Sequence, residues 1–168
     1  MRPAAQYPES AQPSGAQSVG VGRGQRHIAA TGQLSSADAD TRLAGALALI
    51  ELADEWLARP AAADSLTADQ PAREAQAIIH ELCAYIRSPF PLVSEYRRLA
   101  GSAHTDPQAH LKMQQIRDEL SPEARVRERI LAEVSARVSR LGAVGDGPAS
   151  GPWSWLVFDF SGAVFFYP

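Results

Sequence analysis

His80 and Cys83 are the residues whose types and spacing come nearest to a catalytic pair. They lie three positions apart in a stretch expected to be helical, so their side chains share one face. A histidine beside a thiol is an arrangement that activates a cysteine nucleophile. No orienting acid or oxyanion turn accompanies the pair, and free cysteine commonly packs as a small hydrophobe. We therefore interpret Cys83 as a buried structural residue and predict no catalytic site.

Other polar groups give weaker signals for chemistry. His104 and His110 lack the companion ligands that a metal site needs, so we interpret them as surface histidines. Asp54 and Glu55 are adjacent at the end of an expected helix, where a solvated charged edge is favoured over a catalytic carboxylate pair. We expect a non-enzymatic protein without a metal or a cofactor.

Arginines of the expected helix over residues 122–141 provide a second kind of candidate site. Arg125 and Arg129 lie four positions apart, and with Arg137 they form a possible surface for phosphate or an acidic partner. Glutamates interleave with these arginines, which favours intrahelical ion pairs worth about 0.2–0.5 kcal/mol each. The alternative is a small helical regulatory or nucleic-acid-associated protein that uses the arginine face.

Composition limits the partner and the compartment. The net charge of −3, from 16 basic and 19 acidic residues, shows no basic excess, so we do not expect nucleic acid as the partner. A single cysteine excludes an internal disulfide and fits a reducing compartment. No stretch approaches the roughly 18 apolar residues of a membrane helix, and no signal-peptide core follows the N-terminus. We expect a cytoplasmic protein.

Apolar spacing predicts the elements that position these groups. Leu43, Leu47, Ile50 and Leu57 recur at helical intervals, with Leu49, Leu52 and Trp56 in a second row. The predicted fold is mainly α: a small bundle of three principal helices, plus one or two short ones, followed by a short extended or β-helix-like C-terminal stub. The principal helices are expected at residues 39–57, 71–87 and 122–141, and weaker ones at 25–34, within 92–105, and from Asp106-Pro107.

Local signals refine the helix limits. Ser36 or Asp38 is expected to cap the first principal helix. Gly45 inside that helix indicates the close approach of a neighbouring backbone. Ser121 and Pro122 have the chemistry of an N-cap and a first helical position, so we expect a new helix to begin there.

Composition also divides the chain into four parts. Residues 1–24 are rich in Pro, Gly, Ser and Gln and are expected to be disordered. The helical domain is expected over 25–142, a Gly/Pro linker over 143–152, and a separate aromatic segment over 153–168.

The aromatic segment has a five-residue period. Trp155, Phe160 and Phe165 are five apart, and the unit FDFSG followed by AVFFY resembles the pentapeptide repeat. Upstream, RLAGALALIELADEW, LCAYIRSPF, EARVRERILAEV and W-S-W follow one another as in the N-terminal helical region of bacterial pentapeptide repeat-containing proteins. The resemblance covers roughly residues 25–165. It implies a square right-handed β-helix with Phe160 and Phe165 as central inward positions and Phe158 and Ala163 as the second inward set.

The sequence departs from the family pattern in its last residues, and these departures change the predicted function. The chain stops before one four-sided coil closes, and Val164 and Phe166-Tyr167 break the last pentad, so we expect a truncated array. The stub is expected to dock on helix 122–141 or helix 39–57, or to pair with another chain. The resemblance implies a helical capping or interaction module, with a protein partner or self-association through Trp155, Phe160 and Phe165.

Overall fold

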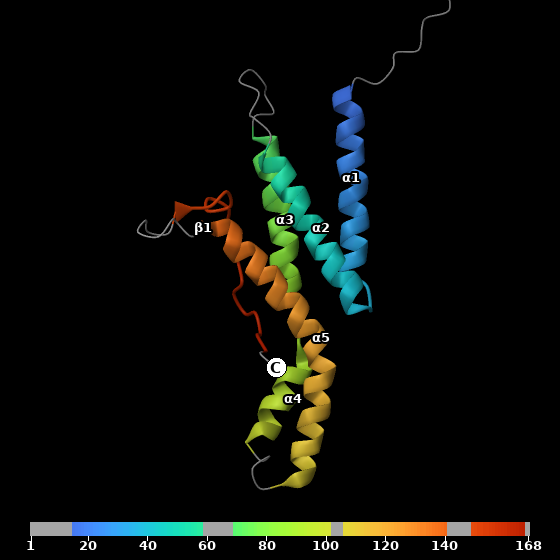
Figure 1. Ribbon diagram of the computed structural model, residues 1–168, viewed down its shortest axis with the longest axis vertical. Coiled ribbons are helices and arrows are strands. Elements are labelled where there is room, and N and C mark those ends of the chain that lie inside the picture. Colours follow the sequence, from blue (N-terminus) through green and yellow to red (C-terminus); the bar gives the residue numbers. More distant parts are fainter. Residues whose placement is uncertain (1–14, 59–68, 102–105, 141–148, 167–168) are drawn as a thin grey trace, which may run out of the picture.

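A computed structural model describes residues 15–58, 69–101, 106–140 and 149–166 (Figure 1). The described chain is mainly helical, which confirms the predicted fold class. The elements, in order, are α1 (Gly15–Leu34), α2 (Ala39–Leu57), α3 (Gln70–Arg87), α4 (Pro91–Ala100), α5 (Pro107–Val138), β1 (Ser139–Arg140) and β2 (Ala149–Ser150).

The helices form a bundle with an extension at one end. α2 packs against α1, α3 and α5, while α4 packs against α5. Figure 1 shows α1, α2 and α3 running alternately down and up, α4 continuing below α3, and α5 returning along the full length of both parts. Residues after β2 then run back beside α5 toward α4 (Figure 1).

The start of α2 and its contact with α1 are as the sequence predicts. The Asp38 carboxylate accepts a hydrogen bond from the backbone N–H of Thr41 at 2.7 Å. A Cβ at Gly45 would lie 2.6 Å from both the Ala30 oxygen and the Leu34 nitrogen of α1. The predicted backbone approach at Gly45 is thus confirmed, and it lets α1 lie directly on α2.

The main core lies between α2, α3 and the C-terminal half of α5. Many of its large side chains are at most 2% exposed, namely Leu49, Ile50, Leu52, Ile78, Ile79, Leu82, Ile86, Val126, Ile130 and Trp153. The buried face of α2 differs from the predicted one. Leu43, Leu47 and Leu57, expected as the main buried row, are only partly buried at the edge of this core. Leu49 and Leu52, expected beside the stripe, are buried instead.

The prediction of a helix start at Ser121-Pro122 is wrong. α5 is continuous through Pro122, and the Ser121 hydroxyl donates to the Arg117 carbonyl at 2.7 Å instead of capping a new helix. Proline lacks an N–H and bends a helix at its position, and the two halves of α5 run in different directions (Figure 1). Each half packs in its own core, which keeps the helix intact across the bend.

A second apolar cluster holds α4 against the N-terminal half of α5. Its buried members are Phe90, Val93, Leu99, Ala109, Ile116 and Leu120. Two residues near the end of the described chain, Val164 and Phe166, pack against it. The C-terminal segment therefore touches both cores.

Two predicted boundaries also move. α1 begins at Gly15 rather than Gln25, so residues 15–24 are helical and not part of a disordered tail; residues 1–14 lie outside the described residues. The expected linker 143–152 contains β2, which pairs with β1 in an antiparallel hairpin. Residues 141–148, and the loop expected over 59–69 up to residue 68, lie outside the described residues.

Candidate functional site

The C-terminal segment, residues 151–166, is contacted by side chains of α2, α3, α4 and α5. It enters beside the end of α5, where the backbone N–H groups of Gly151 and Trp153 donate to the carbonyls of Val138 and Arg137 at 2.9 and 3.0 Å. A Cβ at Gly151 would lie 2.0 Å from the Arg137 oxygen, so only glycine fits this entry. Residues 151–166 form no strand and no β-helix coil.

Trp153 anchors the segment. Its indole is 0% exposed, and its Nε1–H donates to Asp54 Oδ1 of α2 at 2.8 Å. The Arg137 guanidinium lies 5.3 Å from the indole centroid and donates through Nε to Asp54 Oδ2 at 2.8 Å. Asp54 therefore accepts from both neighbours, and α2, α5 and the segment share one polar contact.

Gln76 of α3 recognises the main chain of the segment. Its Nε2 donates to the Val157 carbonyl at 2.8 Å, and its Oε1 accepts from the Val157 N–H at 2.9 Å. A side-chain amide that pairs with both groups of one residue replaces the partner that a neighbouring strand would supply. This contact depends on the backbone and not on the valine side chain.

Asp159 provides a charged contact to α3. Its carboxylate forms an ion pair with Arg87 and accepts from the Ser161 N–H and hydroxyl at 3.0 and 2.6 Å. The Ser161 hydrogen bonds, together with Arg87, lower the pKa of Asp159. Beneath this turn Cys83 is 1% exposed, and burial raises the pKa of its thiol, partly offset by a backbone hydrogen bond from Asp159. A buried thiol with a raised pKa is a poor nucleophile.

Aromatic side chains fill the spaces between these polar contacts. Phe158 stacks between Trp153 and Phe160, with ring centroids 6.4 and 6.2 Å apart, and both phenylalanines pack on the main core. Gly162, at φ 75°, turns the chain toward the second core. There Phe166 meets Tyr96 edge-on, at a centroid distance of 4.9 Å.

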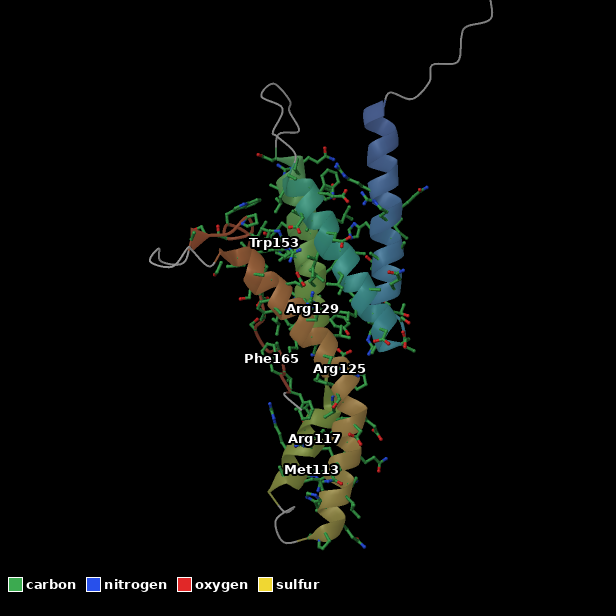
Figure 2. All side chains as sticks on the ribbon, viewed as in Figure 1. Met113, Arg117, Arg125, Arg129, Trp153 and Phe165 are labelled. Carbon is green, nitrogen blue, oxygen red and sulfur yellow. The ribbon has the colours of Figure 1, made fainter. Side chains whose placement is uncertain are left out.

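The residues predicted to face inward in a β-helix are only partly buried in the structure. Phe158, Phe160 and Ala163 are partly buried against the main core, but no β-helix surrounds them. Phe165 is 36% exposed instead of central, because the turn at Gly162 aims Val164 and Phe166 at the second core. Figure 2 shows Phe165 beside α5 on the trace of the segment.

An open groove lies where the segment crosses α3. It is lined by Asp69, Ala72, Arg73, Gln76, Ala77, His80 and Trp155. Trp155 is 57% exposed and Val157 is 64% exposed, so two large apolar side chains of the segment reach solvent at this point. Tryptophan is enriched at protein–protein interfaces, so Trp155 is the residue of this groove that a partner would contact.

Arg127 is a buried polar residue that joins α3, α4 and α5. It is 3% exposed and donates to the carbonyls of Ile86 and Ser88 at 2.8 and 3.1 Å, so it satisfies free carbonyl groups at the end of α3. Its guanidinium also lies 4.5 Å from the Phe90 ring centroid. Glu123 accepts from its Nε at 2.7 Å.

Glu123 continues this network to α2. The Tyr85 hydroxyl donates to Glu123 at 2.7 Å, and Arg42 lies 3.0 Å from the same carboxylate. Burial and the hydrogen bond to Glu123 both raise the pKa of Tyr85, which stays protonated. The network is internal and structural.

The predicted arginine surface is divided by ion pairs. Arg125 is exposed, while Arg129 pairs with Glu133 at 2.6 Å. Arg137 pairs with Glu133 and Asp54, and faces inward against Trp153. Figure 2 shows Arg125 and Arg129 along α5. Because Arg137 faces inward instead, the three arginines do not form one surface.

The other candidates for chemistry are dispersed. His80 is exposed at the α3 groove and Cys83 is buried. Glu55 forms a bidentate ion pair with Arg26 of α1, at 2.6 Å for each contact, so it faces away from Asp54's partners. His110 bonds to Gln114, and His104 lies outside the described residues.

In the described ranges, no three His, Cys, Asp or Glu side chains gather as a metal site would require. None of the described helices combines the length and apolar character needed to span a membrane.

Sequence reasoning missed Trp153, Gln76, Arg87 and Arg127. The five-residue step selected Trp155, although the tryptophan two positions earlier is the buried one. No local signal marks Gln76 or Arg87 as partners of residues more than 70 positions away. Helical spacing indicates the burial of Arg127, since it lies three positions before Ile130 and seven before Val134, on the same face of the helix.

No protein-family model matches the sequence, and no curated protein or solved structure is significantly similar to it.

Proposed function

We propose that this protein is a non-enzymatic interaction module whose helices hold an extended aromatic segment. The observation that carries the proposal is the pairing of the Gln76 amide with both backbone groups of Val157. Main-chain hydrogen bonds to an extended chain, with pockets for its alternate side chains, are one of the ways in which proteins bind peptides, and here the Gln76 amide supplies the main-chain bonds.

The arrangement of contacts supports the same role. Trp153, Phe158 and Phe160 are held against the main core, and Phe166 is held against the second one. Charged groups of the segment and of α3 match, since Asp159 faces Arg87. These contacts lie along one continuous path over α2, α3, α5 and α4.

A capping role within the pentapeptide repeat family is the specific form of this proposal. Terminal units of repeat proteins cover one end of an array and present a polar outer face to water. In this proposal the helices cap the FDFSGAVFF stretch, and the protein partner or second copy meets the module at Trp155, which is 57% exposed. We place the protein in the cytoplasm, consistent with its single free cysteine.

Cys83 supplies the test, because the backbone of Asp159 in the segment hydrogen-bonds to its thiol and the sequence has no other cysteine. We expect the native thiol to react with a disulfide reagent far more slowly than in denaturant. Gln76→Ala removes two hydrogen bonds, worth about 1 kcal/mol each, and is expected to speed the reaction about tenfold or more. Gln76→Glu is expected to act similarly, since a carboxylate cannot donate to the Val157 carbonyl.

Gln115→Ala is the matched control, because Gln115 is an exposed glutamine of α5 whose amide donates to Glu119, one turn further along the same helix. It is expected to leave the rate of thiol reaction unchanged. Equal rates for wild type and Gln76→Ala, or a wild-type rate equal to that in denaturant, would refute the proposal.

A further inference from the structure

The helix α1 buries few apolar side chains of its own. In its residues 22–34, whose side chains the structure describes, only Ala30 and Leu34 are buried, at 3% and 7% exposed. Ile28 is 76% exposed. An element with few buried apolar contacts opens at a lower free energy than the core does. The core helices α3 and α5 are therefore held more firmly than α1.

Glycine also weakens α1 as a helix. A Cβ at Gly22, Gly24 or Gly32 would meet no neighbouring group within 4 Å, so no close contact accounts for these three glycines. Each of them lowers the helix–coil equilibrium about fivefold relative to alanine. Gly45 of α2 differs, because α1 backbone atoms leave no room for a Cβ there. The helical conformation of α1 therefore depends on its contact with the bundle.

Polar contacts of complementary charge complete the attachment of α1. Arg26 donates to both oxygens of Glu55 on α2, at 2.6 Å each. On α3, Glu81 contacts His27 at 2.8 Å and accepts from the Thr31 hydroxyl at 3.0 Å. The α1 sequence has arginines and no acidic residue, whereas these partners are carboxylates. The face beneath α1 therefore selects a basic helix.

Arg23 favours release of α1. Its guanidinium lies 4.7 Å from the Trp56 ring centroid, and its Nε lies 3.6 Å from a Glu55 oxygen. Its Nε and Nη1 are buried without a hydrogen-bond acceptor. A buried donor without an acceptor costs free energy, which hydration recovers when the group becomes exposed. The Arg23 contact therefore offsets part of the attachment made by Arg26.

The connection between α1 and α2 allows α1 to leave without disturbing α2. Arg42 of α2 donates through Nη1 to the carbonyls of Ser36 and Ala37, at 2.9 and 2.8 Å. These bonds persist when α1 is released, because they join the connection to α2. A hinge needs only a few residues at the end of an element, and Leu34 and Ser35 lie at that place. Figure 1 shows α1 at the edge of the bundle, beside α2 and away from the C-terminal segment.

We propose that α1 is a releasable cover over a second interaction surface, and that this surface binds a basic helix with small side chains. The surface consists of Gly45, Glu55 and Trp56 of α2 and Glu81 of α3, which α1 contacts. Gly45 admits the close approach of a helix backbone, and the two carboxylates attract basic side chains. Because α1 has this chemistry itself, it competes with the partner. The surface does not include residues 151–166, so the Cys83 test of the proposed function is independent of it.

Hydrogen exchange of the full-length protein tests the release. Amides of α1 are expected to exchange at least about tenfold faster than those of α3. Gly22→Ala/Gly24→Ala is expected to slow exchange in α1 about tenfold and to leave α3 unchanged. Equal protection of α1 and α3 in the wild-type protein would overturn the proposal.

A fluorescent peptide tests the surface. The peptide has the sequence of residues 15–34 with Gly22→Ala, Gly24→Ala and Gly32→Ala, which favour its helical form, and fluorescence anisotropy measures its binding. In the full-length protein, Leu34→Ala removes a buried anchor of α1, whereas the peptide brings its own leucine. The peptide is therefore expected to bind Leu34→Ala at least about tenfold more tightly than the wild-type protein.

Gly45→Ala is the matched control in the protein. Its Cβ displaces α1 but obstructs the peptide in the same way, so the peptide is expected to bind it at least about tenfold more weakly than Leu34→Ala. In the peptide, Arg26→Glu places a like charge beside Glu55 and is expected to weaken binding about fivefold at low salt. Ile28→Glu in the peptide changes an exposed position and is expected to leave binding unchanged.

The same measurements give the results that would overturn the proposal. They are no binding of the peptide to Leu34→Ala, equal binding to Leu34→Ala and to wild type, and equal binding to Leu34→Ala and to Gly45→Ala. Exchange in α3 shows whether each variant keeps its core. Loss of α3 protection in Leu34→Ala or Gly45→Ala would also overturn the release, because α1 would then unfold together with the core.

Discussion

The carboxylate of Asp54 receives the indole N–H of Trp153 at 2.8 Å across 99 positions of sequence. Its second oxygen accepts from Arg137 at the same distance. One α2 side chain thus fixes the end of α5 and the beginning of the C-terminal segment together. The relationship explains why a segment without regular secondary structure has a fixed place in this fold.

Replacement of Trp153 tests the anchor. Trp153→Ala is expected to lower the free energy of unfolding by about 3–5 kcal/mol, because it removes a fully buried aromatic ring. Trp153→Phe keeps most of the ring and loses the donor to Asp54, at a cost of about 1–3 kcal/mol. Urea unfolding gives both values. Trp155→Phe is the control and is expected to change stability by less than about 0.5 kcal/mol; a larger effect at Trp155 than at Trp153 would contradict the assigned anchor.

Arg127 is expected to be essential for stability although it is charged. Arg127→Ala leaves Glu123 without one partner and the carbonyls of Ile86 and Ser88 without donors, at a cost of about 3–5 kcal/mol. Arg127→Lys is expected to recover only part of this, because one ammonium cannot replace the planar fork. Arg125→Ala, at an exposed site of the same helix, is the matched control and should be neutral in thermal unfolding.

Two glycines in neighbouring helices should respond oppositely to alanine. Gly45→Ala destabilises, because its Cβ would meet α1 backbone atoms at 2.6 Å. A Cβ at Gly32 of α1 would meet no neighbouring group within 4 Å. Gly32→Ala is therefore expected to raise the free energy of unfolding by about 0.5–1 kcal/mol through helix propensity. Calorimetric melting of the two variants measures this. Stabilisation by both would mean that α1 does not lie on α2.

Acid should weaken the fold through specific carboxylates. Hydrogen bonds from Thr41 lower the pKa of Asp38, and the Arg26 hydrogen bond lowers that of Glu55. Lowered folded-state pKa values mean that the unfolded chain takes up protons first, so stability is present above the ordinary values of 3.8 and 4.5 and is lost as pH falls through the folded ones. The urea concentration at the unfolding midpoint is therefore expected to decrease as the pH is lowered below about 4.5.

Asn at position 38 separates the titration from the cap. Asp38→Asn retains a side-chain oxygen that caps α2 but does not titrate. Its urea midpoint is expected to depend less on pH between about 5 and 3 than that of the wild type. An unchanged pH dependence would show that Asp38 contributes nothing to the acid response.

The limits of α2 and α3 were determined by the sequence. Asp38 before an apolar helical repeat starts α2, and Pro71 near the start and Arg87 at the end bound α3. These signals act within one helical turn, so neighbours in sequence suffice to read them. The close approach at Gly45 is also predictable from the sequence. Glycine destabilises a helix interior, so its presence there indicates that a neighbouring backbone leaves no room for a side chain.

Tertiary structure decided the remaining features. The local chemistry at Ser121-Pro122 is that of a helix start, but packing of both halves of α5 in separate cores keeps the helix continuous. The five-residue step selected Trp155, whereas the position of Asp54 on α2 buries Trp153. The place of the segment depends on pairs such as Gln76 and Val157, 81 positions apart. Such pairs exist only once the helices have packed, because the free energy that fixes them comes from surfaces that distant residues create together.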